Sequence, residues 1–135
     1  VRDLLGLKTD IIGVVADAAP AVALSFAQGH PVPTNAAATF ADGMACRDPV
    51  AEPIDIICRG AARVVRVTED DIAEAMRAYY EDTHNLAEGA GAAPLAALMQ
   101  EREQMQGKRV ALILSGGNID REVFAEVLAG RTPRS

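Results

Sequence analysis

A serine, two glycines and an asparagine directly follow a run of apolar residues near the end of the chain. The run 109–114 is apolar after its first residue, and it leads into Ser115, Gly116, Gly117 and Asn118. Such a run is typical of a strand covered on both faces, and parallel sheets bind ligands at the carboxyl ends of their strands. Ser115 would then offer a hydroxyl at a ligand-binding edge, where glycines let the backbone approach a flat or anionic group. The alternative, a serine that simply ends a strand, stays open on the tetrapeptide alone.

The carboxylate of Glu88 is the second candidate group. It stands between Leu86-Ala87 and the glycine-rich stretch 89–91. An unpaired charge beside closely packed backbone is costly, so this carboxylate either pairs, shifts its pKa or faces a polar cofactor site. A solvent-facing acid at a helix start, stabilised by the helix dipole, is an equally open interpretation.

Other polar residues give weaker signals. Asp42-Gly43 is typical of a plain turn more often than of a substrate loop. Lys8 and Lys108 are the only lysines, and neither lies in an apolar stretch that would lower its pKa for Schiff-base chemistry. Neither lysine is therefore a candidate for Schiff-base chemistry.

The elements that must position these groups alternate along the chain. Strands are predicted over residues 11–15, 63–67 and 109–114. Residues 1–8 are predicted to form the end of a helix, and further helices are predicted from Pro20 to Gly29 and over 53–59. Another helix is predicted to begin at the Thr68–Asp71 capping box. After a loop that includes 88–91, a separate helix is predicted to extend to about Met105, and a last one to surround 123–127 after a cap at Asn118 or Asp120. This order predicts an α/β fold with a mostly parallel sheet flanked by helices, as a single domain over residues 1–135.

Composition narrows the class of function. Half of the 135 residues are apolar and the formal net charge is −6, so no basic surface for nucleic acid is predicted. No apolar run approaches the roughly 18 residues of a membrane-spanning helix. Two cysteines without metal spacing favour free thiols in a cytoplasmic protein. The chain lacks an initiator methionine and a signal-peptide pattern, so we expect a trimmed, processed or partial chain.

Four motifs follow one another in an order that resembles a known family. They are Thr39-Phe-Ala-Asp-Gly43, Arg63-Val-Val-Arg-Val-Thr68, Glu88-Gly-Ala-Gly-Ala92 and Ser115-Gly-Gly-Asn-Ile-Asp120. In this order they resemble the serine/threonine dehydratase (threonine ammonia-lyase) family of fold-type II pyridoxal-phosphate enzymes. The resemblance covers nearly the whole chain but only the C-terminal half of such an enzyme, within its large, cofactor-bearing domain.

This resemblance implies a cofactor-binding role for one group of residues. Ser115 would face the pyridine nitrogen of pyridoxal phosphate, and Glu88 would lie near the ring. Gly116 and Gly117, followed by Asn118, would let the backbone pass close to the ring edge.

The resemblance also implies an activity for the complete enzyme. It would be a pyridoxal-phosphate-dependent dehydratase (ammonia-lyase) that converts threonine or serine into a 2-oxo acid and ammonia, with Asp42 and Gly43 on the substrate side. A serine-racemase-like activity, or elimination from another β-hydroxy amino acid, is the first alternative. A non-catalytic α/β module that binds a partner chain is the alternative of another class.

Two features of the family are missing from the sequence. Its Schiff-base lysine and its glycine-rich phosphate loop lie upstream of the matched region. The resemblance therefore implies that this chain contains no catalytic residue and is inactive alone. We expect it to associate with a complementary N-terminal part of the enzyme, within a homo-oligomer. Some family members bind a divalent cation through two acids after the first strand, whereas Val14–Pro20 holds only Asp17. Because His30 and His84 also lack partners at metal-ligand spacing, no metal site is predicted.

Overall fold

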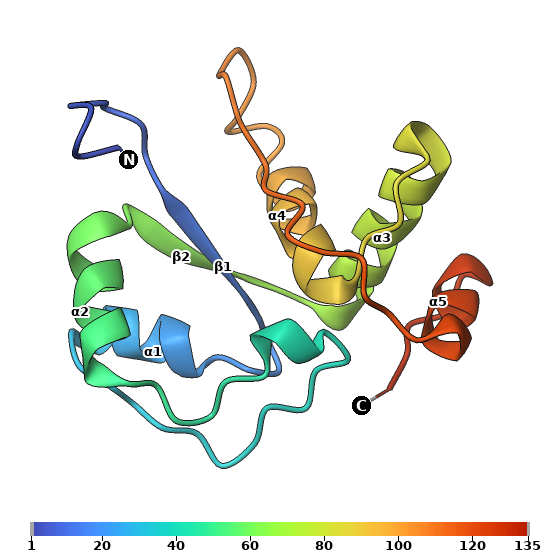
Figure 1. Cartoon of the computed structure of the whole chain (residues 1–135), viewed down its shortest axis with the longest axis horizontal. Helices are drawn as coiled ribbons and strands as arrows, with labels where there is room; N and C mark the ends of the chain where they lie inside the picture. The colour runs from blue at the N-terminus through green and yellow to red at the C-terminus, as the bar shows by residue number, and fades with distance from the viewer. Residues whose placement is uncertain (1, 135) are drawn as a thin grey trace.

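Two strands, five α-helices and one short 3-10 helix make up the described part of the chain. The computed structural model describes residues 2–134 (Figure 1). Its elements are β1 (Ile12–Ala16), α1 (Ala21–Gln28), the short 3-10 helix η1 (Asp42–Met44), α2 (Ala51–Gly60), β2 (Arg63–Val67), α3 (Glu69–Thr83), α4 (Gly89–Gln100) and α5 (Arg121–Leu128). This order confirms the predicted α/β class.

The two strands form a parallel pair. Ile12 lies opposite Arg63, and Ala16 lies opposite Val67 at the other end. Valine and isoleucine dominate both strands, as expected for side chains that pack well on a pleated surface. In Figure 1, α1 and α2 lie on one side of the pair while α3 and α4 lie on the other, so helices flank the sheet as predicted.

The main core lies where α3 and α4 pack together beside the sheet. α3 begins with the predicted capping box, in which the Thr68 hydroxyl accepts a hydrogen bond from the Asp71 amide at 3.1 Å and the Asp71 carboxylate accepts one from the Thr68 amide at 3.0 Å. Ile72 and Met76 of α3 are fully buried. The buried residues of α4 are all small: Gly89, Gly91, Ala92, Ala93, Ala96 and Ala97. Small side chains let the two helices approach closely.

The predicted strand over 109–114 is wrong for this structure. Residues 108–120 form neither helix nor strand, and Val110, Ile113 and Leu114 are 43%, 76% and 36% exposed. A strand needs a neighbouring strand to satisfy its backbone hydrogen bonds. Within residues 2–134 the sheet contains β1 and β2 alone, so the apolar run has no partner.

Several helix ends also differ from prediction. α2 begins earlier than expected, at Ala51, because a proline is tolerated in a first helical turn. α4 ends at Gln100 rather than near Met105. Residues 2–6 form turns rather than the end of a helix, and Val1 lies outside the described residues. No helix among the described residues is long and apolar enough to cross a membrane.

Candidate functional site

The start of α4 is the meeting point of three segments that the sequence analysis singled out. The Glu88 amide donates a hydrogen bond to the Gly116 carbonyl at 3.1 Å, which joins the helix start to the glycine pair. On another side, a Cβ built at Gly43 would lie 2.9 Å from the Cβ of Ala90. The structure therefore brings η1, the start of α4 and the Gly116-Gly117 pair together.

Close packing within the chain explains the glycines on one side of this site. A Cβ at Gly91 would lie 2.5 Å from the Gly116 carbonyl oxygen. A Cβ at Gly116 would lie 2.7 Å from Oε1 of Glu88, and one at Gly117 would lie 2.5 Å from the Leu86 carbonyl oxygen. Each distance is too short for a side chain, so the glycine pair lies flat against the start of α4.

The loop around η1, residues 39–44 (the η1 loop), covers the other side of the helix start. A Cβ at Gly89 would lie 2.7 Å from the Cβ of Ala41 and 3.3 Å from Cε2 of Phe40. Ala41 is only 1% exposed. The loop that carries Asp42 is therefore held by direct backbone packing on α4.

The Glu88 side chain lies half-buried at the start of α4. Glu88 is the N-cap residue of α4, yet its half-buried side chain makes no capping hydrogen bond. Its Oε1 lies beside Gly116. The first amide groups of the helix have no intrahelical acceptor, and the positive end of the helix dipole lies here. The carboxylate is thus held at the helix start, where both interpretations of Glu88 from the sequence remain compatible with its position.

The remaining candidate polar residues lie at the surface. Ser115, Asn118 and Asp42 are exposed. The sequence predicted that Ser115 follows the end of a strand. In the structure it does not, because the preceding run 109–114 is not paired. Ser115 lies between Leu114 and the Gly116-Gly117 pair. Asp120 is the N-cap residue of α5, although its side chain makes no capping hydrogen bond.

Asp17, the acid at the place where some relatives would bind a cation, makes an ion pair instead. Its Oδ1 lies 2.5 Å from Nη2 of Arg66, and both side chains are about half exposed. Across residues 2–134, no three histidine, cysteine, aspartate or glutamate side chains lie close enough to share a metal ion.

Glu69 is a residue of this region that the sequence analysis missed. Its Oε2 accepts hydrogen bonds from the Thr39 hydroxyl and the Phe40 amide, both at 3.0 Å. Its Oε1 is buried and has no hydrogen-bond partner among residues 2–134. The one available signal was that three consecutive acids follow Thr68, although a capping box needs only one of them.

The sequence matches one family of known proteins over most of its length. Residues 2–116 match the family described as pyridoxal-phosphate dependent enzyme. An L-threonine ammonia-lyase of Geobacter sulfurreducens is 43% identical over 119 residues, which are 87% of this chain and 29% of that protein. An L-threonine ammonia-lyase of Thermotoga maritima is 31% identical over 121 residues, which are 90% of this chain and 30% of that protein. The chain therefore spans less than a third of these relatives.

A solved structure shows the same fold. The processed form of threonine deaminase isoform 2 from Solanum lycopersicum has a TM-score of 0.84 and 29% identity. The match covers 96% of this chain and 38% of that one.

Proposed function

The chain belongs to the family of pyridoxal-phosphate-dependent enzymes, and on that basis we propose that it is the C-terminal part of a threonine or serine ammonia-lyase. The complete protein would convert the β-hydroxy amino acid into a 2-oxo acid and ammonia. The single observation that carries the proposal is the packing of Glu88 and Gly91 against Gly116. This contact joins two of the four motifs that resemble the dehydratase family, which supports a shared site there.

The residues at this place fit a planar, anionic cofactor. Ser115 offers an exposed hydroxyl, Asn118 an exposed amide, and the start of α4 the positive end of a helix dipole. The Glu88 carboxylate lies beside Gly116, so a ligand held at the glycine pair would lie near it. When bound, pyridoxal phosphate supplies an electron sink for the charge that develops on the substrate α-carbon.

We assign Ser115 as the hydrogen-bond partner of the pyridine nitrogen. A neutral hydroxyl does not hold that nitrogen protonated, whereas a carboxylate would. Glu88 would lie near the ring, and the Gly116-Gly117 backbone would bound its edge. The covalent lysine anchor would come from the rest of the protein, so the chain itself holds and orients the cofactor and supplies no catalytic group.

We assign the η1 loop to the substrate side of the same site. Gly43 packs on Ala90 and Ala41 packs beside Gly89, which brings the loop to the end of α4 that holds Glu88. The backbone at Asp42 and Gly43 would then form part of the wall around the amino acid and exclude water from it.

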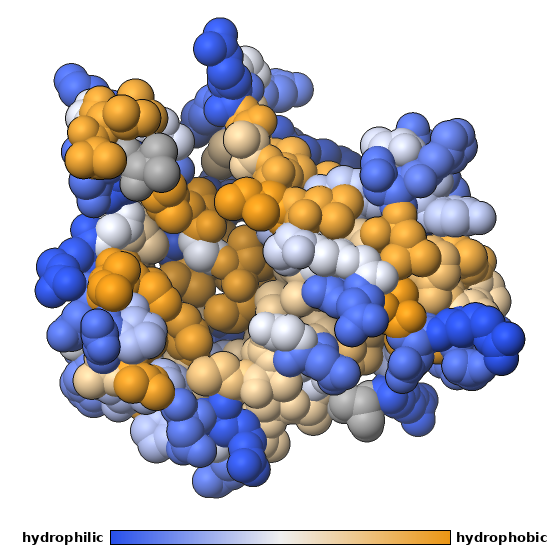
Figure 2. All heavy atoms as spheres, viewed as in Figure 1, coloured by the Kyte–Doolittle hydropathy of each residue, from blue (hydrophilic) through white to orange (hydrophobic). Residues whose placement is uncertain are grey.

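A complementary N-terminal part of the protein would cover an apolar face that is open in this chain. Figure 2 shows hydrophobic residues gathered over a hollowed face. Ile11, beside β1, is 46% exposed and Ile113 is 76% exposed. One edge of β1 also has no strand partner within residues 2–134. Parallel sheets of this kind are normally buried on both faces. We further expect the complete protein to be a homo-oligomer.

A cytoplasmic location is also part of the proposal. Cys46 and Cys58 are free thiols. Free cysteines are typical of proteins in reducing compartments.

Substitution of Ser115 in the complete protein tests this proposal. Wild-type protein should release ammonia and a 2-oxo acid from threonine or serine. Ser115→Ala removes one hydrogen bond worth about 1 kcal/mol, so cofactor affinity should fall by roughly fivefold. Ser115→Asp should strengthen the electron sink and slow the elimination. Thr9→Ala, at another exposed hydroxyl, is the matched control and should change neither value.

Two results would contradict the proposal in different ways. Failure of the wild-type protein to release ammonia from any β-hydroxy amino acid would refute the activity. Normal turnover and normal cofactor affinity in both Ser115 variants would refute the ring contact, and Ser115 would then be an ordinary surface serine.

A further inference from the structure

We propose that Glu69 is a positioning residue for the amino-acid side of the site. Its carboxylate holds the η1 loop against the start of α4 and so sets where Asp42 and Gly43 lie. The inference rests on the proposed function, which assigns these two residues to the substrate side. Glu69 lies outside all of the motif segments that carried the assignment of the site.

Hydrogen bonds from the η1 loop to Glu69 connect the loop to α3. Two donors, the Thr39 hydroxyl and the Phe40 amide, converge on Oε2 of Glu69 at 3.0 Å each. The Thr39 hydroxyl also accepts a hydrogen bond from the Ala41 amide at 3.1 Å. Thr39 is only 3% exposed. One carboxylate oxygen therefore orders three consecutive loop residues, and hydrogen bonds to a charged acceptor are stronger than neutral ones.

On its opposite side, the η1 loop packs against the first turn of α4. Ala41 lies so close to Gly89 that a Cβ at Gly89 would be 2.7 Å from the Cβ of Ala41. Gly43 is similarly close to Ala90. The loop is thus enclosed between Glu69 at the start of α3 and the first turn of α4. Loss of the Glu69 carboxylate frees the loop on one side, because packing on α4 alone blocks only inward movement.

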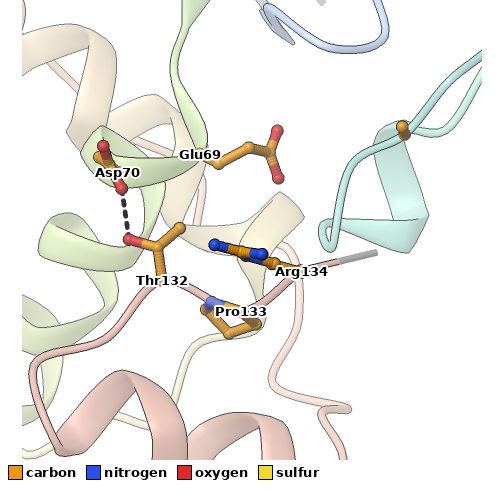
Figure 3. A pocket seen from close by; sticks show the side chains of 6 residues that line it. Glu69, Asp70, Thr132, Pro133 and Arg134 are labelled. Carbon is orange, nitrogen blue, oxygen red and sulfur yellow. Dashed lines mark hydrogen bonds between the residues drawn. The ribbon is translucent and has the colours of Figure 1, made fainter.

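Glu69 takes no part in capping α3. The capping box at the start of α3 is made by Thr68 and Asp71. Asp70 instead accepts a hydrogen bond from the Thr132 hydroxyl, as Figure 3 shows. Glu69 also has a buried oxygen, Oε1, that finds no hydrogen-bond partner in the described part of the chain. A buried carboxylate oxygen without a partner costs free energy. In Glu69 this cost accompanies the hydrogen bonds that hold the loop.

Glu69 and the neighbouring Asp70 both line a small hollow beside the C-terminal segment. Glu69 and Arg134 line the same hollow of about 390 Å³, together with Thr132 and Pro133. In Figure 3 the guanidinium of Arg134 lies below the Glu69 carboxylate.

The test compares four forms of the complete protein, each with pyridoxal phosphate: wild type, Glu69→Ala, Glu69→Gln and Asp71→Ala. Asp71→Ala is the matched control, because it weakens the same first turn of α3 without removing a bond to the η1 loop. Steady-state kinetics with threonine and serine give KM and kcat. Hydrogen exchange followed by mass spectrometry reports on the amides of residues 39–44, and does so independently of activity.

We expect Glu69→Ala to raise KM by roughly tenfold and to change kcat less, since it releases the substrate-side loop. The same variant should speed hydrogen exchange at Phe40 and Ala41. Glu69→Gln keeps an acceptor oxygen and should restore most of both properties. Asp71→Ala should lower stability but leave KM and the exchange of residues 39–44 at wild-type values.

The outcomes separate this inference from the proposed function. Unchanged loop exchange in Glu69→Ala, an unchanged KM, or equal effects from Asp71→Ala would overturn the positioning role. A wild-type protein that turns over no β-hydroxy amino acid would overturn the proposed function. In that case the exchange comparison alone would decide whether Glu69 orders the loop.

Discussion

The contact between Gly91 and Gly116 leads to a prediction in which two opposing effects can be weighed. Gly91 lies in the first turn of α4, where alanine would favour the helix by about 1 kcal/mol. The new Cβ, however, would lie 2.5 Å from the Gly116 carbonyl oxygen and 3.2 Å from the Gly116 nitrogen. To reach an ordinary contact, the backbone must move by roughly 0.9 Å, and such overpacking costs about 1–3 kcal/mol.

That movement has a second cost. It would lengthen the 3.1 Å hydrogen bond from the Glu88 amide to Gly116, which contributes about 1 kcal/mol. Gly117 cannot move aside freely, because it already lies against the Leu86 carbonyl. Gly91→Ala should therefore lower the free energy of unfolding by about 1–3 kcal/mol, with the steric effect exceeding the gain in helix propensity.

Urea unfolding followed by circular dichroism, at fixed protein and cofactor concentrations, measures this difference. Gly60→Ala is the matched control, because Gly60 ends α2 and a Cβ there meets nothing within 4 Å. The control should be neutral or slightly stabilised. If Gly91→Ala proved as stable as Gly60→Ala, Gly116 would not pack on α4 and the geometry of the site would be wrong.

Three further predictions concern other parts of the chain. Thr68→Ala removes the capping box and should lower the free energy of unfolding by about 1 kcal/mol in urea titrations, whereas Thr68→Ser should not. Burial raises the pKa of Tyr79 above its usual value, so the unfolded state ionises first and the urea midpoint should fall as the pH rises above about 10; a Tyr79→Phe variant should lose this dependence. Ile113→Lys should lower the melting temperature of the complete protein by an amount equivalent to about 2 kcal/mol, because the proposed N-terminal part would cover Ile113. Val50→Lys, at a residue 66% exposed, should have little effect, and equal melting temperatures for the two lysine variants would contradict that cover.

Local patterns predicted the elements whose causes lie within a few residues of sequence. The strand Arg63–Val67 has the predicted bounds, because its apolar run is flanked by clear breaks. The Thr68–Asp71 capping box depends on a spacing of three residues and is present as expected. The left-handed Gly29 also ends α1 where the sequence indicated.

Features that depend on distant partners could not be predicted in this way. The run Val110–Leu114 has the composition of a buried strand, but pairing requires a neighbour that the described residues do not supply. Glu69 was missed because its partners, Thr39 and Phe40, lie 30 and 29 residues earlier in the chain. Three adjacent acids look alike in a helix start, and only the fold distinguishes the one that turns toward the η1 loop.

The unpaired edge of β1 also governs how the 135-residue chain behaves in solution by itself. An open strand edge beside exposed apolar residues is a template for pairing with another copy. A formal net charge of −6 opposes that association through electrostatic repulsion. The repulsion disappears near the isoelectric point of about 4.8. Salt shortens its range, because the Debye length is about 10 Å at 0.1 M ionic strength. Colloidal stability of the separate chain should therefore be greatest in alkaline, low-salt buffer and lowest in mildly acidic buffer.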